Sequence, residues 1–167
     1  YSTTLENLQL ANFQLRKASL SGEIAHDVAS FDFIVKDSLN KTIHGLAGNL
    51  ASFNKVIRVS LAEKGFLLYY NQWDSEGTLE IHPKGIIADA IRLSYNGQQL
   101  AIKSKEYEPN APIELQANRI ELNELGKAFL QDSMLVGGLL NANIEVRNLA
   151  ESPAYTGDFI IQQLAIT

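Results

Sequence analysis

The chain contains no cysteine among its 167 residues. This absence excludes disulfide bonds, catalysis by a thiol and zinc held by thiolates. A chain without thiols tolerates an oxidising compartment, although many cytosolic proteins also lack cysteine. Cysteine usage therefore permits a location outside the cytoplasm without indicating one.

Basic residues are outnumbered, since 14 Lys and Arg stand against 19 Asp and Glu and give a net charge of −5. Binding to nucleic acid requires a basic face that neutralises phosphates, so the charge argues against a nucleic-acid partner.

Long apolar runs are missing too. The longest clear run extends only from Phe66 to Tyr70, far short of the roughly 20 residues of a membrane-spanning helix. The length of 167 residues, 46% of them hydrophobic, predicts a single domain with an apolar core.

Sequence motifs of catalysis are missing as well. The chain has no GxxxxGK[ST] loop, no GxGxxG, no GxSxG and no HExxH, which are the signatures of phosphate binding, dinucleotide binding, serine hydrolysis and zinc proteolysis. The histidines have no ligand spacing and fall in different expected elements: His26, His44 and His82. We therefore expect no catalytic residue, no metal and no cofactor, and a protein that is not an enzyme.

Hydrophobic residues alternate with polar ones along most of the chain, a period of two that is typical of β-strands. Shifts of parity, such as that between Leu10 and Phe13, indicate bulges or bends. The strands expected on this basis cover residues 8–15, 18–24, 30–36, 42–50, 56–61, 66–70, 78–82, 86–95, 98–104, 113–120, 139–146 and 156–167.

Asn96-Gly97 is the clearest turn signal, because Asn-Gly readily supplies the two positive φ values of a type I′ turn. The two-residue loop predicts a hairpin in which Leu93 pairs with Leu100 and Ile91 with Ile102. These four side chains then share an apolar face, and Arg92 and Ser94 lie on a polar face with Ala101 and Gln99.

One segment departs from the strand pattern. Leu122, Leu125 and Phe129 recur at helical spacing and predict a short helix from about Leu122 to Gln131. Gly126 weakens that helix by about 1 kcal/mol relative to alanine.

Trp73 is the single tryptophan. We expect it to be either a buried indole at a corner of the fold or an aromatic that stacks on a sugar or a partner.

Two arrangements would remove the apolar faces of the strands from water. These faces pack against each other in most all-β domains, which gives a closed β-sandwich with a filled core. Alternatively, one apolar face curves around an open cavity. Periodicity does not distinguish the two arrangements, because the same residues are removed from contact with water in both.

The sequence begins at Tyr1 rather than at an initiator Met, and no leader pattern follows. We therefore expect a segment of a longer chain.

The second half of the chain resembles a known family. Gln72-Trp73 precedes Thr78-Leu79-Glu80-Ile81, and further strand signatures follow in a characteristic order at residues 84–87, 91–94, 98–104, 117–122, 136–142 and 153–161. This succession is similar to the carboxy-terminal region of TamB-like proteins, the inner-membrane components of the translocation and assembly module, within the wider AsmA-like family of bridge-like lipid transporters. The likeness covers about the last 95 residues well and the first 70 only by pattern. Its motifs are degenerate strand signatures.

The resemblance implies an all-β fold, an elongated, curved and mainly antiparallel sheet that forms a U-shaped apolar trough, with the short helix capping, plugging or lining it. It also implies a periplasmic segment of a protein anchored in the inner membrane of a Gram-negative cell. Its expected partners are phospholipid or another acyl-chain lipid, the outer-membrane barrel partner of the module, and the rest of its own chain. The expected activity is passive conduction of acyl chains, or guidance of outer-membrane β-barrel substrates, and the alternative is a β-sandwich adhesin or protein-interaction module.

On this interpretation the trough is lined by apolar residues of the predicted strands. They are Val59, Leu61, Leu79, Ile81, Ile91, Leu93, Leu100, Ile102, Leu115, Ile144, Val146, Phe159 and Ile161.

Overall fold

The structure is a computed structural model that describes residues 2–10, 13–129, 136–149 and 152–166. Its elements in chain order are β1 (Ser2–Leu10), β2 (Phe13–Ser21), β3 (Ile24–Ala25), β4 (Val28–Lys36), β5 (Thr42–Phe53), β6 (Val56–Leu68), β7 (Asn71–His82), β8 (Gly85–Tyr95), β9 (Gln98–Ser104), β10 (Ile113–Glu121), α1 (Leu122–Phe129), β11 (Val136–Arg147) and β12 (Ala154–Ile166).

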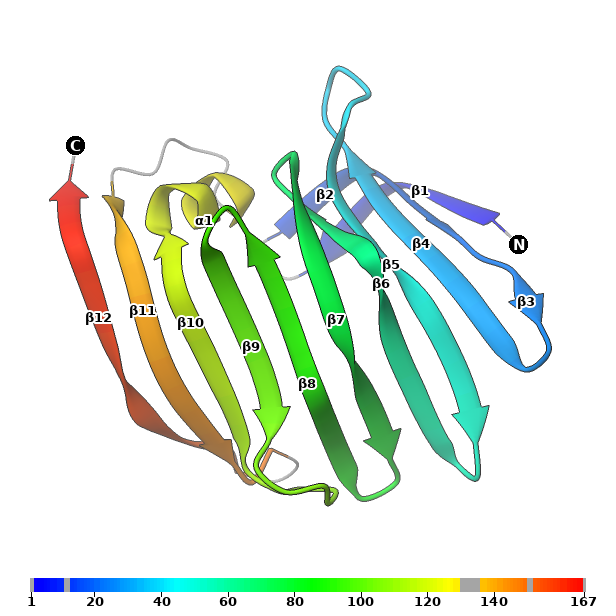
Figure 1. The fold of residues 1–167 in the computed structure, drawn as a ribbon. Helices are drawn as coiled ribbons and strands as arrows, with labels where there is room; N and C mark the ends of the chain where they lie inside the picture. The colour runs from blue at the N-terminus through cyan, green and yellow to red at the C-terminus, as the bar shows by residue number, and fades with distance from the viewer. Residues whose placement is uncertain (1, 11–12, 130–135, 150–151, 167) are drawn as a thin grey trace.

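The described strands form one 12-stranded antiparallel sheet, in the order β1-β2-β4-β5-β6-β7-β8-β9-β10-β11-β12 with β3 paired to β4 (Figure 1). Apart from the detour around β3, strands that follow each other in the chain are neighbours in the sheet. Most connections are therefore short turns, which suits a sequence of alternating strands separated by Asn, Gly and Pro signals. The edges of the sheet are β1 and β12.

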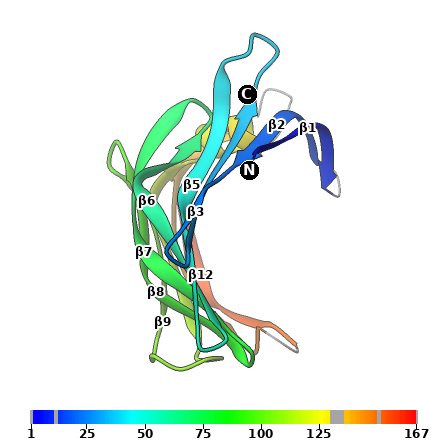
Figure 2. The same cartoon turned by 90° about the vertical axis from the view of Figure 1, so that its right-hand side faces the viewer.

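The sheet is open and strongly curved, and Figure 2 shows it as a trough seen end-on, with α1 and the β1–β2 hairpin on its concave side. Irregularities in the ladder accompany this curvature, including the register shifts between β5 and β6 and between β7 and β8. Ala90, Arg119 and Gln163 have positive φ values inside strands. Such bulges bend a strand and increase its twist. The expected fold class, an elongated curved antiparallel sheet with one short helix, is confirmed.

The Asn96-Gly97 hairpin forms as predicted, with φ values of 47° and 80° at the two turn residues. Leu93 pairs with Leu100 and Ile91 with Ile102. The turn thus sets a register that places four aliphatic side chains on one face.

Four expectations about local structure were wrong. Residues 18–24 are not one strand, because β2 ends at Ser21 and β3 begins at Ile24. Residues 8–15 are not one bulged strand, since β1 ends at Leu10 and β2 begins at Phe13, with Leu10 and Phe13 paired across a hairpin. Residues 56–61 and 66–70 belong to a single strand, β6, which ends at Leu68. Trp73 is buried as expected, but it lies within β7 rather than at a corner of the fold.

Helix α1 begins where predicted, at Leu122, and is described as far as Phe129; the predicted end at Gln131 lies outside the described residues. Within the described part of the chain, no helix has the length and apolar character needed to cross a membrane.

The core of the molecule is small. Trp73, Ala117 and Ile120 form a buried cluster, and Leu125 of α1 packs against it from the concave side. The chain exposes 11291 Å² of surface, whereas a compact monomer of 18.5 kDa exposes about 8200 Å². The excess is the consequence of a single sheet whose faces are not covered by a second layer, so the closed sandwich considered above does not form.

Candidate functional site

The concave face of the sheet is apolar from strand to strand. Leu46 and Leu50 lie four residues apart in β5 and so point to the same side. Leu46 pairs with Phe66, and Leu50 pairs with Val59 of β6. Val59 in turn pairs with Leu79 of β7. The apolar surface therefore runs without interruption across these three strands.

The same surface continues through the second half of the sheet. Ile91 of β8 pairs with Ile102, Ile102 with Leu115, and Leu115 with Ile144 of β11. Trp73 joins the two halves, because it pairs with Phe66 and its ring lies 5.7 Å from that of Tyr95 across the β7–β8 irregularity. One apolar row thus crosses four consecutive strands and is continuous with the surface of β5–β7.

Every residue that the sequence interpretation placed in the trough lies on this face by register. They are Val59, Leu61, Leu79, Ile81, Ile91, Leu93, Leu100, Ile102, Leu115, Ile144, Val146, Phe159 and Ile161. The alternation of strand side chains brings them together from seven strands. Their role in binding lipid stays a prediction.

Many side chains of the concave face remain in contact with solvent. Phe159 of β12 is 71% exposed and Ile161 is 37% exposed, whereas Val146 is buried. Contiguous apolar surface of this kind marks a site of interaction with a protein, a lipid or a ligand. The concave face is therefore the candidate functional site.

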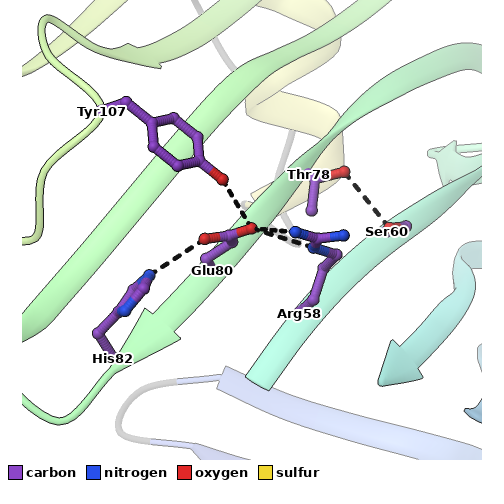
Figure 3. Close-up of polar contacts among 6 residues, drawn as sticks. All are labelled: Arg58, Ser60, Thr78, Glu80, His82 and Tyr107. Carbon is purple, nitrogen blue, oxygen red and sulfur yellow. Dashed lines mark hydrogen bonds and ion pairs between the residues drawn. The ribbon is translucent and has the colours of Figure 1, made fainter. Parts of the chain in front are cut away.

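The convex face is mainly polar, and it carries a cluster of hydrogen-bonded side chains around Glu80 (Figure 3). Glu80 in β7 is only 4% exposed. Its Oε1 accepts hydrogen bonds from Arg58 Nη2 at 2.6 Å and from the Tyr107 hydroxyl at 2.8 Å, and its Oε2 lies 3.1 Å from His82 Nε2. Tyr107 comes from the connection between β9 and β10, so the cluster fastens that loop to the convex face.

The electrostatics of this cluster follow from its donors. The hydrogen bond from Arg58, followed by that from Tyr107, lowers the pKa of Glu80 below its usual value and keeps the carboxylate charged. The bond to Glu80 raises the pKa of Tyr107 and keeps its phenol protonated. The donors of Arg58, Tyr107 and His82 converge on the Glu80 carboxylate and attach the loop to the sheet, so we assign the cluster a structural role.

Helix α1 is attached to the sheet by a buried amide. Gln98 opens β9 and is buried; its Nε2 donates to Glu124 Oε2 at 2.8 Å, and its Oε1 accepts from the backbone N–H of Glu121 at 2.9 Å. Both ends of the amide are therefore satisfied. Together with Leu125, this contact holds α1 over the cluster that contains Trp73.

Trp73 carries a buried donor without a partner. The residue is 3% exposed, and its indole Nε1–H makes no hydrogen bond within the described structure. A buried polar group without a partner costs about 1–3 kcal/mol. The indole lies on the concave side of the sheet, in the buried apolar cluster against which Leu125 of α1 packs.

The histidines do not come together. His26 lies in the turn after β3, His44 in β5 accepts a hydrogen bond from the Tyr69 backbone N–H at 3.3 Å, and His82 contacts Glu80. Burial lowers the pKa of His44 and favours its neutral form. Among the residues that the structure describes, no three His, Cys, Asp or Glu side chains are grouped so as to hold a metal ion.

Sequence reasoning missed Glu80, Gln98 and the unpaired Trp73 donor. Glu80 alternates with Leu79 and Ile81, which signals only a polar face, and Tyr107 of the covering loop follows 27 residues later. Gln98 looked like an ordinary residue after a turn. Each depends on a contact between distant segments, which a pattern along one strand does not reveal.

Comparisons with known proteins identify no relative: no family model, no curated protein and no solved structure matches this chain.

Proposed function

We propose that this chain is a non-enzymatic, periplasmic segment of a TamB-like protein that conducts phospholipid acyl chains along its concave face. The observation that carries the proposal is the continuous apolar face of a single-layer sheet, which no second sheet covers among the described residues. The sequence resemblance to TamB-like proteins supports the same function. The opposite face is mainly polar, with charged and amide side chains such as Arg58, Glu80 and Glu145, so only the concave side offers a continuous apolar path.

The physical benefit of such a surface is large. Moving a sixteen-carbon acyl chain from a bilayer into water costs on the order of 12 kcal/mol, at about 0.8 kcal/mol per methylene. A face lined by aliphatic side chains removes most of this cost while the polar headgroup stays in water. The apolar face supplies no energy of its own, so the segment acts as a passive conduit.

The dimensions fit one segment of a longer path. Ten spacings separate the strands from β1 to β12 along the sheet, and at about 4.8 Å each they span about 48 Å. This length exceeds the roughly 30 Å hydrocarbon core of a bilayer. On this proposal the rest of the protein, anchored in the inner membrane of a Gram-negative cell, continues the trough toward an outer-membrane barrel partner.

The alternative, an adhesin or interaction module with a filled core, needs a second layer over the apolar face. Nothing in the described sheet provides one, and the side chains of β12 are exposed on both faces. The open arrangement therefore favours the conduit.

Photo-crosslinking tests the proposal with neighbouring positions of one strand. Ile161 faces the concave side by its pairing with Leu140, and Ile160, which is 62% exposed, faces the convex side. A photoreactive residue at Ile161 is expected to capture phospholipid in membranes, and the same residue at Ile160 is not. Leu93 and Arg92 of β8 form a second such pair.

Equal capture at both members of each pair, or no capture at either, would contradict conduction on the concave face. Because Ile160 is the more exposed of the two isoleucines, a preference for Ile161 would not arise from accessibility alone.

A further inference from the structure

The unpaired donor of Trp73 lies in the middle of the sheet, beneath α1. Phe66 contacts the indole edge-on at 6.2 Å between ring centroids, and Tyr95 lies against it at 5.7 Å. These two rings hold the indole in place between β6 and β8. Its Nε1–H is therefore held inside the buried cluster on the concave side of the sheet.

Nearby polar groups among the described residues do not satisfy this donor, because none places an acceptor within hydrogen-bonding distance of Nε1; their own hydrogen bonds run elsewhere. The Tyr95 hydroxyl donates to Asn71 Oδ1 at 3.1 Å, and the Gln98 amide bonds to Glu124 and to the backbone of Glu121. Ser75, two residues further along β7, donates its hydroxyl to the carbonyl oxygen of Ala62 at 2.5 Å. The described part of the chain supplies no acceptor for Trp73, and the donor is left open to one on a ligand.

The surroundings specify the shape of that ligand. From Trp73 to Ile81 at the other end of β7 is eight residues, about 26 Å of strand at about 3.3 Å per residue. The concave side chains over this distance are mainly aliphatic, as Leu79 and Leu93 illustrate. A single acyl chain spans about 15 Å, half of the hydrocarbon core of a bilayer, and therefore fits within the apolar surface.

The same surroundings distinguish a lipid from a peptide. An extended peptide carries a donor and an acceptor at nearly every residue, and the aliphatic surface would leave them unpaired. An acyl ester carries its acceptor oxygens at one end and no donors along its chain. One fixed donor at the end of a long apolar surface is complementary to the ester.

We propose that the Trp73 indole N–H is the recognition point of an acyl-ester site, in which it donates a hydrogen bond to a carbonyl oxygen of the lipid while the acyl chain lies on the aliphatic surface below. The proposal rests on the proposed function and adds to it a position and a chemical preference. The ligand reaches Nε1 by parting the side chains of the cluster that α1 covers.

The test uses two probes that differ only in the carbonyl group: dihexanoyl phosphocholine, a diester, and its dihexyl ether analogue, both below their micelle concentrations. The wild-type chain is expected to bind the ester about 2- to 12-fold more tightly than the ether, the value of one neutral hydrogen bond. Trp73→Phe keeps an aromatic ring without the donor and is expected to bind both probes equally. Tyr95→Phe, which removes a hydroxyl engaged with Asn71, is the control that keeps the preference.

A second measurement needs no variant. Because Trp73 is the single tryptophan, the protein has one indole N–H signal in its ¹H–¹⁵N spectrum. That signal is expected to move downfield when the ester binds and to move much less when the ether binds.

Several results would overturn the inference. An ester preference that persists in Trp73→Phe, or equal binding of the two probes by the wild-type chain, would overturn it while leaving apolar conduction intact. Failure of both probes to bind would count against the proposed function as well. Tight binding of an extended apolar peptide, sensitive to Trp73→Phe and without lipid binding, would assign the site to peptide instead.

Discussion

Glu80 is a carboxylate that contributes to stability from the polar side of the sheet, although it is almost completely buried. Burial of a charge is costly unless donors compensate it, and Arg58, Tyr107 and His82 provide that compensation. Arg58 and Tyr107 reach Glu80 from the partially hydrated surface. The cluster is therefore worth less than a fully buried network of the same size.

Glu80→Gln is expected to lower the free energy of unfolding by about 1–2 kcal/mol, since hydrogen bonds to a charged group are stronger than those to a neutral one. Glu76→Gln is the matched control, because Glu76 pairs with Arg92 at an exposed site on the same strand and is expected to change stability by less than about 0.5 kcal/mol. Urea denaturation measures both. Equal losses in the two variants would contradict the assigned role of the cluster.

The pH dependence of stability provides a separate prediction. The pKa of Glu80 is lowered in the folded protein, first by Arg58 and then by Tyr107. Its contribution is therefore fully present above the pKa of the unfolded chain and is lost as pH falls through the lower folded pKa. The stability difference between wild type and Glu80→Gln is expected to be constant near neutral pH and to shrink in acid below about pH 4.5. A difference that grows on acidification would reverse the sign argued here.

Among the elements, the β8–β9 hairpin depends most clearly on one backbone position. Gly97 has a φ of +80°, and a Cβ added there would meet no atom within 4 Å. Gly97→Ala therefore tests backbone strain without a steric clash and is expected to destabilise by about 1 kcal/mol. Gly137→Ala in β11, where φ is not positive and the nearest atom is 3.8 Å away, is the control expected to be nearly neutral. Thermal denaturation of both variants measures the effect, and equal shifts in Tm would be inconsistent with it.

This hairpin also illustrates how far the sequence determines the elements. Asn96-Gly97 closes a two-residue turn, so the local sequence sets the register of two strands. The shift of parity between Leu10 and Phe13 was interpreted as a bulge, whereas the structure places these residues opposite each other across a hairpin. A bulge and a tight turn produce the same change of parity, and the intervening Ala11-Asn12 has no glycine to distinguish them. The buried contacts of Glu80 and Gln98 depend on tertiary neighbours and were not predictable from either strand.

At the scale of the whole molecule, the single-layer sheet leads to an unusual shape for a chain of this length. A compact protein of 167 residues has a radius of gyration of about 15 Å. Small-angle X-ray scattering of the monomer is expected to give a value well above this, because the open sheet has no second layer. A value at or below about 15 Å would indicate that the sheet closes on itself in solution.

The two edge strands have a related consequence. Both β1 and β12 have one side without a neighbouring strand in the described sheet, and such edges pair readily with other strands. The isolated chain is thus expected to self-associate as concentration rises, so the scattering measurement requires a chromatographically separated monomer.

The central claim is that the concave face holds acyl lipid, and native mass spectrometry of the chain purified from Gram-negative membranes tests it most directly. The wild-type chain is expected to carry adducts with phospholipid masses. Ile102→Glu, which places a charge on the concave face, is expected to lose them, and Ala101→Glu, one residue away on the convex face, is expected to retain them. A wild-type chain without lipid adducts, or equal adducts in the two variants, would contradict the claim.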